Sequence, residues 1–386
     1  MKNVLRIVSY ILVAAVASAL TLATCQKEPE KVSSDWSTLE ELKLLIDEKF
    51  IGEVDEEQLL DGAAAGMVDS LPDRWSYYMS SDSYTAYQEQ MNNAYVGIGI
   101  TIVVREDGLL DVSQVNPDSP ALQAGMEPGD ILSQVEGVSV AELGLDGTRD
   151  AIRGEVGTTV NVTVLRDGET IDMTVERQNI NTVVASGRML DNHIGLVQIV
   201  NFDSRCASES IAVIEQLLEQ GATSLIFDVR FNPGGYKHEL VQLLDYLLPE
   251  GPLFCSQSYT GQEYIDTSDA QCLELPMAVL VNWDTYSAAE FFAAALDEYD
   301  AAVVVGEATS GKGHYQNTFE LGNGAAVSLS VGKYFTPNGV SLEGVGITPE
   351  ILVEVDLDTA SRIYSGLVPP EEDPQIQAAV KALISE

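Results

Sequence analysis

Two short segments in the second half of the chain carry the residue types best suited to catalysis. The first is VNWDTYSAAE, residues 281–290, which leaves a predicted buried strand and enters an Ala-rich helix near Ser287. Free N–H groups and the helix dipole stabilise negative charge at a helix N-terminus. Ser287 is therefore a candidate nucleophile.

The second segment is GKGHYQ, residues 311–316, which places Lys312 between two glycines after another predicted buried strand. A buried amine loses the solvation of its charge, so its pKa falls toward neutrality. A neutral amine can then accept the proton of a serine hydroxyl, as in Ser-Lys variants of the catalytic triad. Glu307 precedes this segment, and a carboxylate near Lys312 would instead keep the lysine charged and the enzyme latent.

The three histidines, His193, His238 and His314, are the alternative bases, for a Ser-His-Asp triad. The first begins a predicted strand, the second opens a predicted helix and the third follows the Gly-Lys-Gly turn. None belongs to a nucleophile elbow, because the chain has no Gly-x-Ser-x-Gly motif. We interpret all three as surface or helix-end residues, so a Ser-Lys pair is the stronger hypothesis.

The elements that must position Ser287 and Lys312 alternate between strands and helices from about residue 194 onward. Such alternation predicts a largely parallel sheet covered by helices. The strand-like runs are Ile194–Val200, Ser224–Val229, Ala278–Val281 and Ala302–Gly306, and the helix-like runs are Ser208–Gln220, His238–Leu248 and Ala288–Glu298. A terminal helix is expected over Pro374–Ile384.

Two regions with different predicted secondary structure precede this alternating part. Residues 36–93 contain three predicted helices, the first opened by a capping box in which Ser37 is the cap and Glu40 its partner. Residues 94–178 contain short β-rich runs separated by turn signals such as Asp-Gly and Pro-Gly-Asp. We expect a small helical module followed by a compact, mostly β unit.

The β unit resembles a PDZ domain over its whole length. The matching elements are YVGIGI (95–100), SPA (119–121), AGM (124–126), PGDIL (128–132) and IRG (152–154). Glycines before a strand let consecutive N–H groups converge on a carboxylate, and the strand edge beside them can pair with an extended peptide. The residues expected to do this are Val96, Gly97, Ile98, Gly99 and Ile100. Arg153 matches an arginine thought to report groove occupancy in relatives, the alternative being an arginine that caps a helix end.

The catalytic segments closely resemble the C-terminal processing peptidases, also called tail-specific proteases, and the resemblance covers residues 38–386. Further matching motifs are DVRFNPGG (228–235), YFTPNG (334–339) and GVGITP (344–349). The resemblance implies that Ser287 is the nucleophile, Lys312 the general base and Gln316 the group that orients the lysine. It also implies a crotonase/ClpP-like α/β core with an inserted PDZ domain.

An oxyanion hole is part of this resemblance. A glycine N–H of the Asn-Pro-Gly-Gly turn would act with the N–H of Ala288, because glycine permits the close approach that such a donor needs. Gly234 and Gly235 both qualify, and a plain strand-to-helix turn is the alternative. The chain departs from the family at Thr285 and Ala289, where serines are frequent, and the departure can alter substrate choice. Ser310, just before the Gly-Lys-Gly turn, is a third departure.

Composition limits the classes of partner. The chain has 386 residues, enough for two or three domains, with 60 acidic and 20 basic residues and a net charge of −40. So negative a molecule repels nucleic acid and anionic membrane surfaces, so no nucleic-acid partner is expected. No cofactor or metal is expected either, since the cysteine spacing suits no zinc site.

The N-terminus predicts export from the cytoplasm. Lys2 and Arg6 precede an apolar stretch, Ile7–Ala23, whose length suits either a signal peptide or a short membrane anchor. The following residues resemble a lipoprotein cleavage box, so Cys25 is a candidate for lipid modification. The body is therefore expected outside the cytoplasm, anchored to the membrane or as a lipoprotein, and otherwise secreted. Of the remaining cysteines, Cys255 and Cys272 could face each other across a hairpin.

The expected protein is thus an α+β multidomain serine endopeptidase that recognises apolar C-terminal tails of proteins or peptides and cleaves by acyl-enzyme chemistry. A catalytically silent PDZ-containing binding protein of the cell envelope is the alternative, and an acyl-CoA hydratase-like enzyme a weaker one. A homodimer through the helical module and the C-terminal segment is a further hypothesis.

The expected boundaries are a signal peptide or anchor at 1–25, a polar tether at 26–35, the helical module at 36–93, the PDZ domain at 94–178, the peptidase core at 179–356 and a C-terminal helical segment at 357–386.

Overall fold

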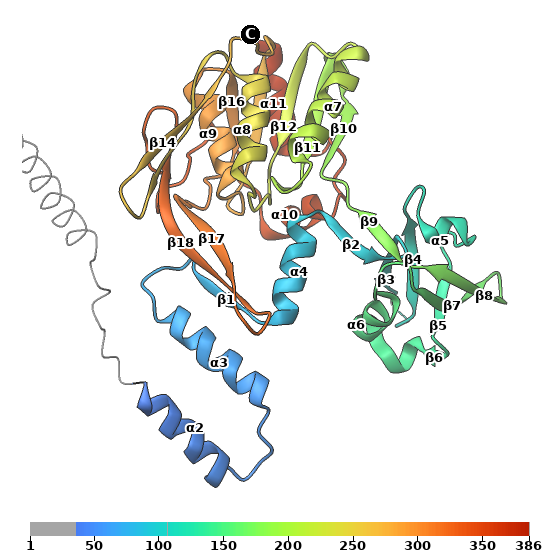
Figure 1. Ribbon diagram of the computed structural model, residues 1–386. Coiled ribbons are helices and arrows are strands. Elements are labelled where there is room, and N and C mark those ends of the chain that lie inside the picture. Colours follow the sequence, from blue (N-terminus) through green and yellow to red (C-terminus); the bar gives the residue numbers. More distant parts are fainter. Residues whose placement is uncertain (1–35, 106, 386) are drawn as a thin grey trace, which may run out of the picture. The chain divides into compact units, whose positions relative to one another are not determined.

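The computed structural model describes residues 36–105 and 107–385 (Figure 1). The leader and tether expected over 1–35, with Cys25, lie outside the described residues. Within the described ranges, no helix combines the length and apolar character needed to cross a membrane. The chain divides into two units, residues 1–63 and 64–386, which we describe separately.

The described part of the first unit is helical. α2 (Ser37–Lys49) has no buried residue, and α3 (Glu56–Asp69) begins in this unit. Lys43 pairs with Asp47 of its own helix at 2.7 Å and links α2 to α3 by an ion pair to Glu56 at 2.8 Å.

The capping box expected at the start of α2 is wrong. Trp36 occupies the N-cap position with helical backbone angles and makes no side-chain cap hydrogen bond. Ser37 is therefore the first residue of the helix and not its N-cap.

The second unit is built on a six-stranded sheet. Its strand order is β10-β11-β12-β15-β16-β19, and every neighbouring pair is parallel except β10 and β11. This confirms the largely parallel sheet expected from the alternating pattern. The strands are β10 (Ala185–Met189), β11 (Ile194–Ile199), β12 (Ser224–Asp228), β15 (Met277–Val281), β16 (Ala302–Gly306) and β19 (Ile351–Leu352).

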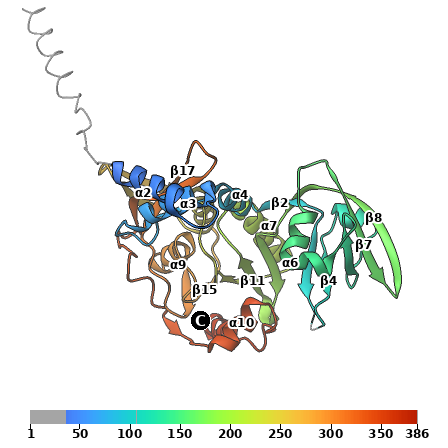
Figure 2. The ribbon, with the colours of Figure 1, turned by 90° about the horizontal axis from the view of Figure 1, so that it is seen from below.

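Helices cover both faces of this sheet, as Figure 1 and Figure 2 show. Successive strand residues point to opposite faces, so Phe227 and Val279 pack with α7, α8 and α9, whereas Ile226 and Ala278 pack with α11. The covering helices are α7 (Cys206–Glu219), α8 (Lys237–Leu247), α9 (Ala288–Glu298) and α11 (Pro374–Ser385), and α10 (Leu357–Tyr364) precedes the last of them.

A second sheet lies beside this core and contains a strand that the sequence did not indicate. β1 (Tyr77–Met79) pairs antiparallel with β18 (Ala326–Phe335). This strand lies between the second and third helices expected in residues 36–93 and was not predicted, because pairing across some 250 positions leaves no local signal. α4 (Ser81–Met91) follows β1, and the other strands are β13 (Gly251–Ser258), β14 (Glu263–Ser268) and β17 (His314–Glu320).

The PDZ unit has its own sheet and its own core. The strand order is β3-β4-β5-β7-β8, with β6 (Val138–Ser139) paired to β5, and buried Ile98, Val112 and Val162 belong to its hydrophobic cluster. β3 lies at the edge of the sheet. The strands are β3 (Ile100–Val104), β4 (Leu110–Val115), β5 (Ile131–Val135), β7 (Thr159–Arg166) and β8 (Glu169–Glu176), with helices α5 (Pro120–Gln123) and α6 (Val140–Ile152).

A short ribbon joins this unit to the core, because β2 (Ala94–Gly97) pairs antiparallel with β9 (Gln178–Asn181). The α+β multidomain fold expected from the sequence is confirmed. The three described cysteines, Cys206, Cys255 and Cys272, are free thiols, so the hairpin disulfide left open for the last two is not formed.

Candidate active site

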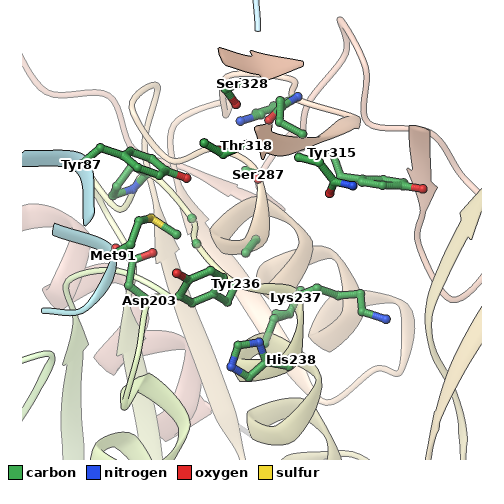
Figure 3. A pocket seen from close by; sticks show the side chains of 18 of the residues that line it. Tyr87, Met91, Asp203, Tyr236, Lys237, His238, Ser287, Tyr315, Thr318 and Ser328 are labelled. Atoms are coloured by element: carbon green, nitrogen blue, oxygen red, sulfur yellow. The ribbon is translucent and has the colours of Figure 1, made fainter. Parts of the chain in front are cut away.

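Several strands of the core sheet end at one edge, and their following loops line a pocket of about 1280 Å³. In open α/β sheets, ligands bind at the carboxyl ends of the strands. Asp203 follows β11, Gly234 and Gly235 follow β12, Ser287 follows β15 and Lys312 follows β16. All five line this pocket, part of which is shown in Figure 3.

Ser287 is the N-cap residue of α9 and is held in a strained backbone conformation. Its φ of 58° and ψ of −124° lie outside the regions that side-chain-bearing residues favour. Its N–H donates to Glu290 Oε2 at 3.1 Å. Strain of this kind persists only where surrounding contacts impose it, and it clusters at functional sites.

Thr285, a departure from the family pattern, helps to impose that conformation. The Thr285 side chain is fully buried, and its hydroxyl donates to Val229 O at 2.9 Å and accepts from Asn282 N at 3.0 Å. The Thr285 carbonyl accepts from Ser310 N at 3.1 Å. The turn before Ser287 is therefore bonded to the loops that follow both neighbouring strands.

Glu290 bonds the segments that carry Ser287 and Lys312 to each other. Its buried carboxylate accepts from Ser287 N, from Lys312 N at 2.9 Å, from Gly311 N at 2.7 Å and from the Thr309 hydroxyl at 2.5 Å. Burial raises the pKa of Glu290, and these four donors oppose the rise. One side chain thus fixes the spacing of the two segments.

The Lys312 amine lies among aromatic rings. Its Nζ is 4.9 Å from the centroid of Trp75 and 5.9 Å from that of Tyr286, and these two rings stack at 6.3 Å. Burial lowers the pKa of Lys312 to about 8, against the opposing carboxylates of Asp73, Glu343 and Glu290. A substantial fraction of the amine is therefore neutral at mildly alkaline pH.

The carboxylates around Lys312 differ from the one singled out in the sequence. Glu307 accepts from Val355 N at 2.9 Å and is not among the groups that shift the lysine pKa. Asp73 and Trp75 were missed, although a polar and aromatic segment between two predicted helices was a weak signal. Arg74 holds this segment in place by donating to Gly311 O at 3.1 Å.

The Asn-Pro-Gly-Gly turn touches the start of α9. A Cβ on Gly234 would lie 2.8 Å from both Ala288 N and Ser287 Cβ, so only glycine fits there. The Gly234 N–H donates to Asn232 Oδ1 at 2.9 Å and is therefore already used. Gly235 has the next N–H of the turn, and the Ala288 N–H belongs to the first helical turn, whose donors have no partner within the helix.

Gln316 and Tyr334 complete the surroundings of Ser287 and Lys312. The Gln316 amide nitrogen donates to His314 O and to Ser330 Oγ, both at 3.0 Å, so both of its N–H groups can be used. The buried Tyr334 hydroxyl donates to the carbonyl oxygen of Lys312. Burial raises the Tyr334 pKa, and a hydrogen bond with Ser287 opposes the rise, so this tyrosine contacts both segments.

Of the three histidines, His238 lines the same pocket. Its ring centroid lies 5.2 Å from that of Tyr236, and its Nε2 is 3.6 Å from a Glu239 oxygen. His314 Nδ1 lies 3.5 Å from Glu343. Among the described residues, no group of three or more His, Cys, Asp or Glu side chains could hold a metal ion.

The residues expected to bind a carboxylate follow one another from β2 into β3. Val96 and Gly97 end β2, Ile98 and Gly99 form the connecting turn, and Ile100 begins the edge strand β3. Gly99 has a φ of 81°, and a Cβ there would lie 2.4 Å from Ser119 Cβ. The turn thus requires glycine at this position, and the adjacent strand edge can take an added peptide strand.

Arg153 follows α6 and contacts α4. Its guanidinium pairs with Glu89 at 2.8 Å and lies 5.3 Å from the ring centroid of Tyr95. The side chain is thus directed to another element and not to the carbonyls of its own helix. Tyr87 and Met91, on the same helix as Glu89, line the pocket that contains Ser287.

Three sequence profiles match the chain. That of Peptidase family S41 matches residues 193–353, that of the PDZ domain matches residues 112–166, and that of the Activating protease CtpB N-terminal domain matches residues 9–83.

Relatives of the same kind match over most of the chain. Carboxy-terminal processing protease CtpA of Bacillus subtilis (strain 168) is 32% identical over 366 residues, which are 92% of this chain and 78% of that protein. CtpB of the same organism is 28% identical over 345 residues, 87% of this chain and 71% of the relative. Among solved structures, an S41 protease from Bacteroides fragilis NCTC 9343 has a TM-score of 0.51 at 17% identity, covering 86% of this chain and 90% of that one, a likeness of fold alone.

Proposed function

The chain belongs to the C-terminal processing peptidases of peptidase family S41 and is a serine peptidase, and we propose that Ser287 and Lys312 form its catalytic dyad. In this proposal the enzyme is an endopeptidase that captures the C-terminal tail of a protein through the PDZ groove. It then cleaves the captured chain through an acyl-enzyme intermediate.

One observation carries the proposal. Ser287 and Lys312 follow adjacent parallel strands, line the same pocket and are bonded to a single carboxylate, that of Glu290. The serine is held in a strained turn at a helix N-terminus, and the lysine has a pKa lowered to about 8. A nucleophile and a base need this kind of proximity and tuning.

The steps of the reaction follow from these positions. Neutral Lys312 accepts the Ser287 proton as the serine oxygen attacks the scissile carbonyl, and the ammonium then protonates the leaving amine. Water attacks the acyl-enzyme in the second half-reaction, with the same lysine as base. Gln316, whose amide nitrogen is occupied, offers its carbonyl oxygen as the group that orients the lysine.

The oxyanion of the tetrahedral intermediate requires N–H donors at the start of α9. We assign this role to the N–H groups of Ala288 and Gly235, because Asn232 occupies that of Gly234. Contact between Gly234 and Ala288 supports the pairing of these two turns. Two fixed donors stabilise the developing charge without reorganisation during the reaction.

The PDZ residues supply substrate selection in this proposal. The turn at Ile98 and Gly99 binds the terminal carboxylate, and the free edge of β3 pairs with the tail. Apolar tails are favoured in this proposal, because a PDZ groove takes the last side chain of the tail into an apolar pocket. The carboxylate itself is bound by main-chain N–H groups and needs no cation, which suits so acidic a protein. The extracytoplasmic location, anchored or secreted, expected from residues 1–25 is part of the same proposal.

Substitution of each dyad member tests the assignment. Ser287→Ala and Lys312→Ala should each reduce cleavage of an unfolded protein with an apolar tail by at least about a thousandfold, because each removes one half of the proton transfer. Lys333→Ala, at an exposed lysine of β18, is the control and should cleave normally. Near-normal turnover in either dyad variant would refute the dyad, and tail binding without turnover in the unmodified protein would favour the binding-protein alternative.

A further inference from the structure

Asp203 lies at the same sheet edge as the dyad but has no part in the proposed reaction. It follows β11, and its backbone is fixed because its N–H donates to Asn201 Oδ1 at 3.1 Å and its carbonyl accepts from Cys206 N at 3.1 Å. The residue is only 2% exposed and lines the pocket. Figure 3 shows its side chain beside Met91 and Tyr236, on the wall below Tyr87.

One oxygen of the Asp203 carboxyl group is buried without a hydrogen bond. Its Oδ1 is inaccessible to solvent and has no partner anywhere in the described part of the chain. Burial of an unpaired polar atom costs free energy, and for an ionised carboxylate the cost is greater still. An orphaned group of this kind in a binding pocket indicates either an absent ligand or a neutral carboxyl.

The surroundings of Asp203 favour the neutral form. Burial and, to a smaller extent, the carboxylate of Glu239 together raise the pKa of Asp203 to about 7. Arg205, two residues further along the chain, is engaged by Glu209 at 2.8 Å and by main-chain carbonyls, and no arginine is among the groups that shift the Asp203 pKa. The Asp203 charge raises the pKa values of Cys206, Tyr236 and Tyr286, which are the other titratable groups around it. His238 lies beyond Glu239, with its Nε2 3.6 Å from a Glu239 oxygen.

The position of the carboxyl group connects it to the catalytic centre. A Cβ on Gly235 would lie 2.6 Å from Asp203 Oδ1, and Gly234 in turn touches Ser287 and Ala288. A peptide carbonyl bound by the N–H groups of Gly235 and Ala288 would therefore place neighbouring parts of the same peptide beside Asp203.

We propose that Asp203 is a substrate-binding residue that acts as a neutral carboxyl group, donating its O–H to a main-chain carbonyl of the bound peptide. The inference rests on the proposed function only in placing that peptide at Ser287. A neutral carboxyl in an apolar site is an effective hydrogen-bond donor. Peptide affinity should therefore depend on whether Asp203 is protonated and not on a charged side chain of the substrate.

A binding measurement without turnover tests this role. The Ser287→Ala protein is titrated with a peptide that has neutral side chains and an amidated C-terminus, so that the PDZ carboxylate turn has no ligand. Fluorescence anisotropy at pH 6.0 and pH 8.5 should give a Kd about three- to tenfold higher at pH 8.5, because the ionised carboxylate can no longer donate one hydrogen bond to the peptide. Residual pH dependence from Lys312 is common to all variants.

Two substitutions of Asp203, each in the Ser287→Ala protein, separate the donor from other roles. Asp203→Asn keeps an N–H donor at every pH, so it should bind about as tightly as the Asp203 protein at pH 6.0 and retain at pH 8.5 only the pH dependence that Lys312 causes in all variants. Asp203→Ala should bind about three- to tenfold more weakly at pH 6.0. Asp358→Asn, at an exposed position in α10, is the matched control and should bind as the Asp203 protein does.

Three results would overturn the proposal. They are equal affinity at both pH values with Asp203 present, an Asp203→Asn protein as weak as Asp203→Ala, or a selective loss of lysine-containing peptides in Asp203→Asn, which would identify a cation site. Circular dichroism of each variant excludes unfolding as the cause. Failure of the dyad would be seen separately, as turnover of the peptide by the Ser287→Ala protein.

Discussion

Lys312 can accept the Ser287 proton only while its amine is neutral, so its neighbours determine the pH range of the enzyme. Burial of Nζ favours the neutral amine, whereas Asp73 and Glu343 favour the charged one. Because the pKa lies at about 8, the rate should rise with pH through that value. At pH 7 about one amine in ten is then neutral.

Removal of a carboxylate near Lys312 should therefore accelerate the enzyme near neutrality. Asp73 has the largest effect among the carboxylates that raise the Lys312 pKa. Asp73→Asn removes this charge, so the acid limb of kcat/KM against pH should move to lower pH. The rate at pH 7 should rise by a few-fold and at most about tenfold, the limit set by full deprotonation. Asp82→Asn, at an exposed position in α4, is the control. An unchanged or higher-pH limb in Asp73→Asn would contradict this account of the base.

The residues that tune the base also show where sequence reasoning ends. Ser287 and Lys312 were indicated because each belongs to a short segment with a local physical logic. Asp73 and Trp75 reach Lys312 across more than 200 positions, and nothing local indicates such a contact. Asp203 was missed for a related reason, since only the folded structure shows that its oxygen has no partner.

At the scale of elements, α4 connects the PDZ unit with the pocket. Glu89 on this helix pairs with Arg153, which follows α6, while Tyr87 and Met91 on the same helix line the pocket. Movement of α6 on peptide binding would be transmitted through this ion pair to the pocket wall. The pair is partly exposed, so its contribution to coupling should be at the low end of the usual range.

This connection predicts that a tail peptide changes the cleavage of a separate substrate. A non-cleavable peptide with an apolar C-terminus should change kcat/KM for a short amidated reporter by about fivefold, and Arg153→Ala should abolish that change. Glu89→Ala should act alike, and the double variant should resemble each single one, because both remove the same interaction. Arg149→Ala, which breaks only exposed ion pairs on α6, is the control. Additive effects of the two substitutions would exclude the pair as the link.

Secondary structure followed the sequence closely where periodicity was strong. The runs that predicted β11, β12, β15 and β16 match the strands to within a residue or two, because buried parallel strands read as continuous apolar segments. β1 was missed since its three residues are a strand only through pairing with β18. The expected cap of α2 failed by one residue, which is the usual precision of helix ends.

At the scale of the whole molecule, a charge of −40 opposes any association between copies of the chain. α2 nevertheless exposes an apolar surface, with Leu39 48%, Leu42 51% and Leu45 49% exposed. Monomeric proteins rarely leave such side chains clustered in water. The balance between these two terms should depend on salt, because salt screens the charge and leaves the apolar term in place.

We therefore expect the protein from residue 36 onward to dimerise through the helical module, and more completely at 500 mM than at 50 mM NaCl. Leu42→Glu combined with Leu45→Glu should give a monomer, because it adds charge to the apolar surface itself. Light scattering over a concentration series measures the mass, and Val156→Glu, on the PDZ unit and 56% exposed, is the matched control that should still dimerise. A monomer at every concentration and both salt levels would contradict dimerisation through the apolar face of α2. Since the dyad and the pocket belong to the second unit, the monomeric variant should still cleave a short amidated reporter, which separates assembly from chemistry.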